Sequence, residues 1–231
     1  PVPLKAPEGR LGTLWPRVGV VSSIENPPWR DAAGLLARLH SADPSRCPQL
    51  GAHGGLRRLE RAVLAAKGLT NGQWLQALDG RPELDSLPAD PTRWLVDLGS
   101  GWAAELAHPR RLTLVHGSWH MGQVGHPLLS KRWRLIDPDD LGVGDPVWDL
   151  ARPAAMYLSG QLELDFWGAF VTAYREAGGL AIPASGDYWP ALLTVARATV
   201  LMSAVHALAT PDAHRPETTA AFIRALDRVG A

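Results

Sequence analysis

Polar residues capable of chemistry follow two short apolar runs in the middle of the chain. The first run, Leu112 to Val115, leads into His116, Ser118, His120 and Gln123. The second run, Trp133 to Ile136, leads into Asp137, Asp139 and Asp140. Carboxylate and amide oxygens can hold a hard cation, and histidine can exchange protons near neutral pH. Loops that follow rigid strands often carry functional groups, so we predict a site where these two loops meet.

The order and spacing of these residues resemble the aminoglycoside phosphotransferase family, small-molecule kinases with a protein-kinase-like fold. That family carries H-G-D-x-H-x-x-N/Q, then a strand that ends in I-D, then G-D-P-x-x-D-L-A. This chain has H-G-S-W-H-M-G-Q from His116, L-I-D that ends at Asp137, and G-D-P-V-W-D-L-A from Gly144. The resemblance covers residues 11–231 and is strongest between residues 112 and 155.

The resemblance assigns a role to each matching residue. His116 and Gly117 correspond to the start of the catalytic loop, and Asp149 to the buried aspartate that braces it. Asp137 corresponds to the aspartate that binds Mg²⁺, and Gln123 takes the place of the metal-binding amide, usually Asn. Through this family the chain is expected to use ATP and Mg²⁺.

Ser118 stands where the family keeps its catalytic aspartate, and this is the main departure from the pattern. A serine hydroxyl is neutral at pH 7 and cannot serve as the general base. The loss of a positioned base typically lowers the rate by about 10²- to 10⁴-fold. Ser118 therefore indicates a strongly attenuated enzyme or a pseudokinase, or an Asp→Ser change introduced to trap a complex.

The resemblance also predicts the fold, which is mainly helical α+β. We expect the C-terminal lobe of the kinase-like fold, with a small β-hairpin carrying the catalytic loop and little of the N-terminal lobe. Residues 1–21 would form a hinge-like remnant of that lobe, and residues 22–231 the helical lobe. Trp15 and Pro16 match a hinge that contacts adenine, although an ordinary edge strand explains them equally well. None of the three lysines, Lys5, Lys67 and Lys131, is placed to pair with the nucleotide phosphates.

Three other interpretations of the same residues were weighed. His116 is more simply explained as a structural residue that packs under the loop and bonds to backbone. His116, His120 and His126 with Asp137 could form a metal site, but residues four apart on a strand and loop need not share a face. A Ser118 nucleophile would indicate a hydrolase, yet G-S-W-H-M-G is not the G-x-S-x-G motif. Asp140 is expected to face solvent, Asp139 could either enlarge the acidic cluster or face solvent, and Trp119 could line a pocket.

Helical periodicity extends over most of the remaining chain. The apolar spacing predicts helices over Trp29–His40, Leu56–Lys67, Asn71–Leu78, Pro91–Ala107, Glu163–Ala177, Tyr188–Leu208 and Pro216–Val229. A further apolar pattern after Pro146 predicts a helix that anchors the G-D-P segment. Leu11 to Val21, with Gly12, Pro16 and Gly19, indicates an edge strand or hairpin. Near Ala191–Ala209 the chain is most apolar, but Arg197 and His206 indicate a buried helix.

Composition limits the possible partners. The 231 residues carry 23 basic and 23 acidic side chains, so no overall charge attracts the chain to nucleic acid or to a membrane surface. The single cysteine rules out an internal disulfide and is typical of the cytoplasm. We therefore expect a cytoplasmic ATP-dependent phosphotransferase in degenerate form, acting on a hydroxyl of a small molecule or modified peptide. The alternative is a non-catalytic binding or scaffolding module. A separate or missing N-terminal lobe would be a further partner.

Overall fold

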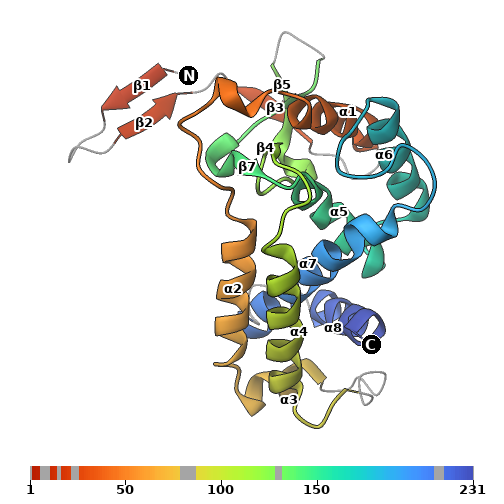
Figure 1. Ribbon diagram of the computed structural model, residues 1–231. Coiled ribbons are helices and arrows are strands. Elements are labelled where there is room, and N and C mark those ends of the chain that lie inside the picture. The colour runs from red at the N-terminus through yellow and green to blue at the C-terminus, as the bar shows by residue number, and fades with distance from the viewer. Residues whose placement is uncertain are drawn as a thin grey trace.

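The protein has a mainly helical α+β fold (Figure 1). The computed structural model describes residues 2–5, 11–14, 17–21, 26–78, 87–127, 132–210 and 216–230. Within these ranges the helices are α1 (Trp29–His40), α2 (Gly55–Ala66), α3 (Asn71–Leu78), α4 (Pro91–Leu106), α5 (Val147–Leu158), α6 (Leu164–Glu176), α7 (Trp189–Ala209) and α8 (Pro216–Gly230). Each helix predicted from apolar periodicity is therefore present, with ends shifted by a residue or two.

The ends of the helices follow local chemistry. At the start of α4, the Asp90 side chain accepts a hydrogen bond from the backbone N–H of Arg93, and Pro91 occupies the first turn. At the end of α6, Gly178 has a positive φ of 74°, which ends the helix with little strain. The ranges predicted from the sequence, Pro91–Ala107 and Glu163–Ala177, place these two ends within one residue.

The strands form small antiparallel sheets. In the described ranges they are β1 (Val2–Lys5), β2 (Leu11–Leu14), β3 (Val18–Val20), β4 (Thr113–Val115), β5 (Val124–Pro127), β6 (Arg134–Leu135) and β7 (Gly142–Gly144). β1 pairs with β2, β4 pairs with β7, and β5 lies between β3 and β6. Residues 11–21, predicted to form an edge strand or hairpin, contain two strands, β2 and β3, and each lies at the edge of a different sheet.

The strands that follow the loop, β5 and β6, are adjacent in sequence and pair antiparallel. The two runs that end at Val115 and Ile136 do not pair with each other, because β4 hydrogen-bonds to β7 and β6 to β5. After β4 the chain turns through a short 3-10 helix, Met121–Gln123, directly into β5, and this strand takes β6 as its neighbour. The loop of interest therefore links two different sheets.

Helix α7 is the centre of the hydrophobic core. It packs against α2, α4, α5 and α8, and it buries apolar residues on several faces, among them Leu192, Val195, Leu201 and Leu208. By length and composition it is the one helix of the described chain that could cross a membrane, and 56% of its most apolar window is buried. Its packing identifies it as the buried helix predicted from the sequence.

The hinge prediction falls on residues that the structure does not describe. Trp15 and Pro16 lie outside the described residues, so the adenine-contacting hinge stays a prediction. The division into residues 1–21 and 22–231 likewise stays a prediction.

In Figure 1, α2 and α4 run side by side in opposite directions below the strands that carry the loop.

Candidate functional site

The loop between β4 and β5 is held from below by a buried carboxylate. Asp149, in the first turn of α5, has no exposed surface. Its Oδ2 accepts a hydrogen bond from the His116 N–H at 2.6 Å, and its Oδ1 one from the Gly117 N–H at 2.8 Å. Two consecutive backbone donors of the loop are thus fixed by one side chain. This is the bracing contact that the resemblance assigned to Asp149.

A second set of hydrogen bonds, made by His40 and Tyr174, fixes the Asp149 side chain; these two residues are called the second layer. The Nε2 of His40, in α1, lies 3.0 Å from Asp149 Oδ2, and its Nδ1 lies 2.6 Å from the Tyr174 hydroxyl oxygen. The Tyr174 oxygen also accepts the N–H of Ala181 at 3.0 Å. Since a carboxylate only accepts, His40 donates through Nε2 and receives the Tyr174 hydroxyl at Nδ1. One chain of hydrogen bonds therefore links α6, α1, α5 and the loop.

The protonation states of Asp149 and Tyr174 follow from their burial and their hydrogen bonds. Burial by itself raises the pKa of Asp149, but the hydrogen bonds from His40, His116 and Gly117 hold that pKa below its ordinary value. Burial raises the pKa of Tyr174, so its hydroxyl remains protonated and able to donate. Asp149 is consequently an anion that is fully satisfied by donors, and its role is to orient the loop.

His116 is buried and bonds to backbone. It is 2% exposed, and its Nε2 lies 2.8 Å from the carbonyl oxygen of Ile136. Because a carbonyl only accepts, Nε2 carries the hydrogen. Its Nδ1 has no hydrogen-bond partner in the structure. This contact ties the loop after β4 to the end of β6, as the structural interpretation of His116 expects.

Ser118, Gln123 and Asp137 meet at the surface of the loop. The Gln123 Nε2 donates to Asp137 Oδ2 at 3.0 Å and lies 3.4 Å from Ser118 Oγ. Gln123 is 6% exposed, and its Oε1 is buried without a partner. Asp137 is exposed and adopts a left-handed conformation, with φ 58°. The Gln123 Nε2 group thus bridges the Ser118 hydroxyl and the Asp137 carboxylate, while Gln123 Oε1 has no hydrogen-bond partner.

Arg58 is a residue of this site that the sequence did not single out. Its Nη2 donates to the Gly117 carbonyl, and its Nη1 lies 3.5 Å from Asp140 Oδ2. Gly117 has a φ of 87°, and a Cβ there would run into the Asp140 carbonyl oxygen. Partial burial lowers the pKa of Arg58, while the charge of Asp140 opposes that shift. Arg58 on α2 therefore holds the loop at the Gly117 carbonyl, one residue before Ser118.

The remaining loop residues do not join the site as proposed. Among the described residues, no group of three or more His, Cys, Asp or Glu side chains is placed to hold a metal ion, which does not support the set of three histidines with Asp137. The Nδ1 of His120 accepts the Gly122 N–H at 3.1 Å. Burial, and then the charges of Arg152 and His116, lowers the pKa of His120.

Trp119 also differs from its predicted role. It is 2% exposed and stacks on Phe170 with ring centroids 5.6 Å apart, so it belongs to the core and does not line a pocket. Asp139 and Asp140 are both exposed, and Asp140 pairs with Arg58. The solvent exposure predicted for Asp140 is confirmed.

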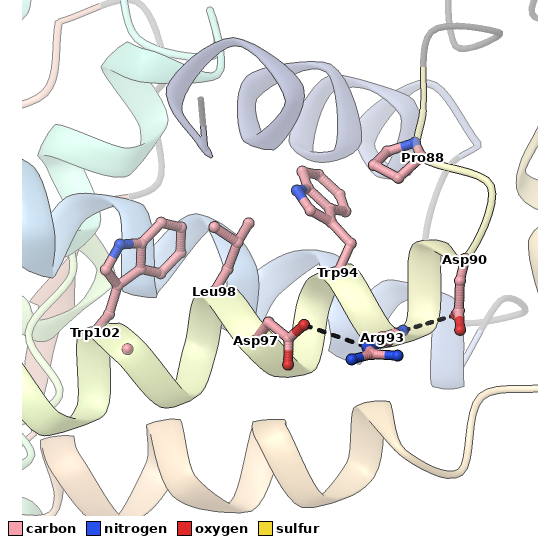
Figure 2. A pocket seen from close by; sticks show the side chains of 8 residues that line it. Pro88, Asp90, Arg93, Trp94, Asp97, Leu98 and Trp102 are labelled. Carbon is pink, nitrogen blue, oxygen red and sulfur yellow. Dashed lines mark hydrogen bonds and ion pairs between the residues drawn. The ribbon is translucent and has the colours of Figure 1, made fainter.

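One cavity in the described part of the chain lies away from the loop. It has a volume of about 550 Å³ and lies along α4, where Figure 2 shows Trp94, Leu98 and Trp102 pointing toward it. Its charged side chains already have partners, since the Arg93 guanidinium pairs with Asp97 at 3.6 Å and the Asp90 carboxylate accepts the backbone N–H of Arg93. We do not assign the chemistry of the loop to this cavity.

Solved structures with the same fold are kinases. The chain is 18% identical to a choline/ethanolamine kinase family protein from Mesorhizobium loti, with a TM-score of 0.54 over 88% of this chain and 62% of that one. It is 13% identical to the choline kinase LicA from Streptococcus pneumoniae, with a TM-score of 0.52 over 87% of this chain and 63% of that one. The chain therefore spans a little over three fifths of the length of these proteins. At such identities the likeness shows the fold alone.

No curated protein sequence matches the chain. The family model of the phosphotransferase enzyme family, however, matches residues 27–193, which is well over half of the chain. The matched segment contains the brace, the loop and all three residues that meet at its surface. It begins just before α1 and ends inside α7. The chain belongs to the phosphotransferase enzyme family, in agreement with its resemblance to the aminoglycoside phosphotransferases.

Proposed function

We propose that the chain is the C-terminal, kinase-like part of an ATP-dependent phosphotransferase whose activity is attenuated. Its acceptor would be a hydroxyl of a small molecule or modified peptide. The observation that carries the proposal is the contact of one Gln123 amide with both Asp137 and Ser118, at the positions of the family's metal ligands and catalytic residue. Because the chain covers only part of its solved relatives, the activity is proposed and is not taken over from them.

Asp137 and Gln123 are the residues that would hold Mg²⁺. The donor set fits a hard cation, since Asp137 offers exposed carboxylate oxygens and Gln123 Oε1 is buried without a partner. It is Nε2 that faces Asp137, so ligation by Gln123 would use the opposite end of its amide. Bound Mg²⁺ would neutralise the charge of the nucleotide phosphates.

The chain's own residues position this site without supplying a base. Asp149 and Arg58 fix the Gly117 peptide from its two sides, so Ser118 is presented at a defined place. The Ser118 hydroxyl can hydrogen-bond an acceptor but cannot take its proton at neutral pH. Rate enhancement would then come from orientation alone, which explains the attenuated activity that we propose.

A binding module without catalysis is the second candidate. Ser118 itself favours it, because every other feature of the loop is kept while the acid is missing. In that case the site would bind a ligand, or present a surface to a partner such as a separate N-terminal lobe. The two candidates differ in whether ATP is converted to ADP.

Affinity for Mg·ATP tests the proposal. Two metal ligands cannot supply the many contacts behind a micromolar affinity of about −8 kcal/mol, so we expect a dissociation constant on the order of millimolar for these 231 residues. Calorimetry should show that Asp137→Ala abolishes the binding. Asp139→Ala is the matched control, because Asp139 is an exposed acid two residues away, and it should bind like the wild type. Low-micromolar binding that Asp137→Ala abolishes would refute the argument from missing contacts.

Turnover separates the two candidates. Slow conversion of ATP to ADP by the wild-type chain, lost in Asp137→Ala, would support the phosphotransferase. Binding with no conversion would support the module. Ser118→Asp alone should not restore full turnover, because the charge stabilisation and positioning expected from an N-terminal lobe are lacking as well as the base. Rapid turnover by Ser118→Asp would contradict this.

A further inference from the structure

Three arginines lie on the two helices, α2 and α5, that hold the loop after β4. Arg58 is fixed there by its bonds to the Gly117 carbonyl and to Asp140, with a side chain that is 30% exposed. Arg61 follows one turn later on α2 and is exposed. Residues three apart on a helix are neighbours on its surface, so Arg61 extends the same face beyond Arg58.

Arg152 approaches the loop from the other side. It follows Asp149 by three residues on α5, and Asp149 accepts the Gly117 N–H. The same helical spacing therefore places Arg152 next to the loop, and it is exposed. Partial burial and then the charge of Arg58 lower the pKa of Arg152, which is consistent with the two guanidinium groups facing one region.

The positive charge of this cluster is poorly compensated. Asp140 pairs with Arg58, and Asp149 is buried and engaged with backbone and His40. Within the part of the chain that the structure describes, Arg61 and Arg152 have no hydrogen bond or ion pair of their own. Like charges that share a region raise the free energy of the unliganded protein, and a bound anion relieves that repulsion.

We propose that Arg58, Arg61 and Arg152 form an anion site beside Ser118, for a ligand that carries a phosphate or carboxylate group. A guanidinium group presents paired N–H donors that match the oxygens of such a group. A polycationic acceptor would be repelled from the same place. The claim that the acceptor is anionic deepens the proposed function and rests on it. The claim that an anion binds here does not depend on the proposed function.

Inorganic phosphate is the probe that tests the site. Calorimetry at low ionic strength should show phosphate binding to the full chain, weakened roughly tenfold by Arg61→Gln and by Arg152→Gln, since each removes a charged hydrogen-bond donor. These two residues are chosen because they have no described partner whose loss would disturb the fold. Arg93→Gln is the control for net charge, because Arg93 lies at the other end of the α2–α4 pair, and it should bind phosphate like the wild type.

Two further arms identify the source of the anion. Phosphate that still binds in excess ADP marks the site as one for an anionic acceptor, whereas competition marks it as a site for the nucleotide's own phosphates. Asp137→Ala removes a negative charge and should not weaken phosphate binding, so a failure of the proposed metal site is distinguishable from a failure of the anion site. Absent binding, or equal binding by wild type, Arg61→Gln and Arg152→Gln, would overturn the inference.

Discussion

Replacing Asp149 by Asn tests whether this carboxylate orients the loop between β4 and β5. The two oxygens of Asp149 accept three buried hydrogen bonds, from the N–H groups of His116 and Gly117 and from His40 Nε2. An amide has one oxygen, so whichever way it is turned, at least one buried backbone donor faces its NH₂ group. An unsatisfied buried donor costs about 1–3 kcal/mol, and the other bonds lose their charge. We expect a loss of about 3–5 kcal/mol in the free energy of unfolding.

Urea unfolding measures this loss, and hydrogen exchange of the Gly117 amide reports on the loop itself. The matched control is Asp97→Asn, since Asp97 makes an exposed pair with Arg93, and the expected change is about 0.5 kcal/mol or less. In Asp149→Asn, the Gly117 amide should exchange faster than it does in the wild type, whereas the amides of β4 should change less. A variant within about 1 kcal/mol of the wild type, with unchanged exchange, would refute the brace.

The pH dependence of stability gives an independent check. The pKa of Asp149 is lower in the folded protein than its ordinary value. Its contribution is therefore complete above the unfolded pKa of about 3.9 and is lost as the pH falls from there through the folded pKa. Asp149→Asn should lack this part of the acid-side decline. An identical decline in the two proteins would mean that other carboxylates carry the effect.

Three other substitutions follow from the same geometry, each measured by urea unfolding. Gly117→Ala should lose at least about 2 kcal/mol, because its positive φ disfavours a side chain and its Cβ would meet the Asp140 carbonyl; a neutral effect would contradict that backbone conformation. Trp119→Ala should lower the free energy of unfolding by about 3–5 kcal/mol, because Trp119 is a core residue; a change below about 1 kcal/mol would contradict its burial. Tyr174→Phe leaves His40 Nδ1 without its donor, so the free energy of unfolding should fall by about 1–3 kcal/mol and the Gly117 amide should exchange faster. Unchanged exchange of the Gly117 amide would show that Tyr174 does not support the loop.

Much of this fold could be predicted because its signals are local. A helix is encoded by the spacing of apolar residues within itself, as in α1, and its ends by single residues such as Asp90 and Gly178. The loop was found because Ser118, Gln123 and Asp137 keep a characteristic order along the chain. Short strands are different, since the run at β4 gives no sign of whether β6 or β7 will be its partner.

The residues that sequence reasoning missed act across long separations. Arg58 meets Gly117 over 59 positions, and His40 meets Asp149 over 109 and Tyr174 over 134. No local pattern distinguishes these side chains from other helical residues of the same type. Trp119 was misplaced for a similar reason, because its neighbour Phe170 comes from α6. The motif locates a loop, whereas its supports are known only once the helices have packed.

The position of α7 near the end of the chain has a consequence for how the protein folds. Helices α2, α4 and α5 all bury their apolar sides against α7, which begins only at Trp189. During synthesis, these helices emerge well before the partner that completes their core. Their contacts with α7 are therefore of long range, which slows folding and leaves apolar surface exposed in the meantime. The brace of the loop stands on α5, so the final packing of that helix depends on α7, which follows it in the chain.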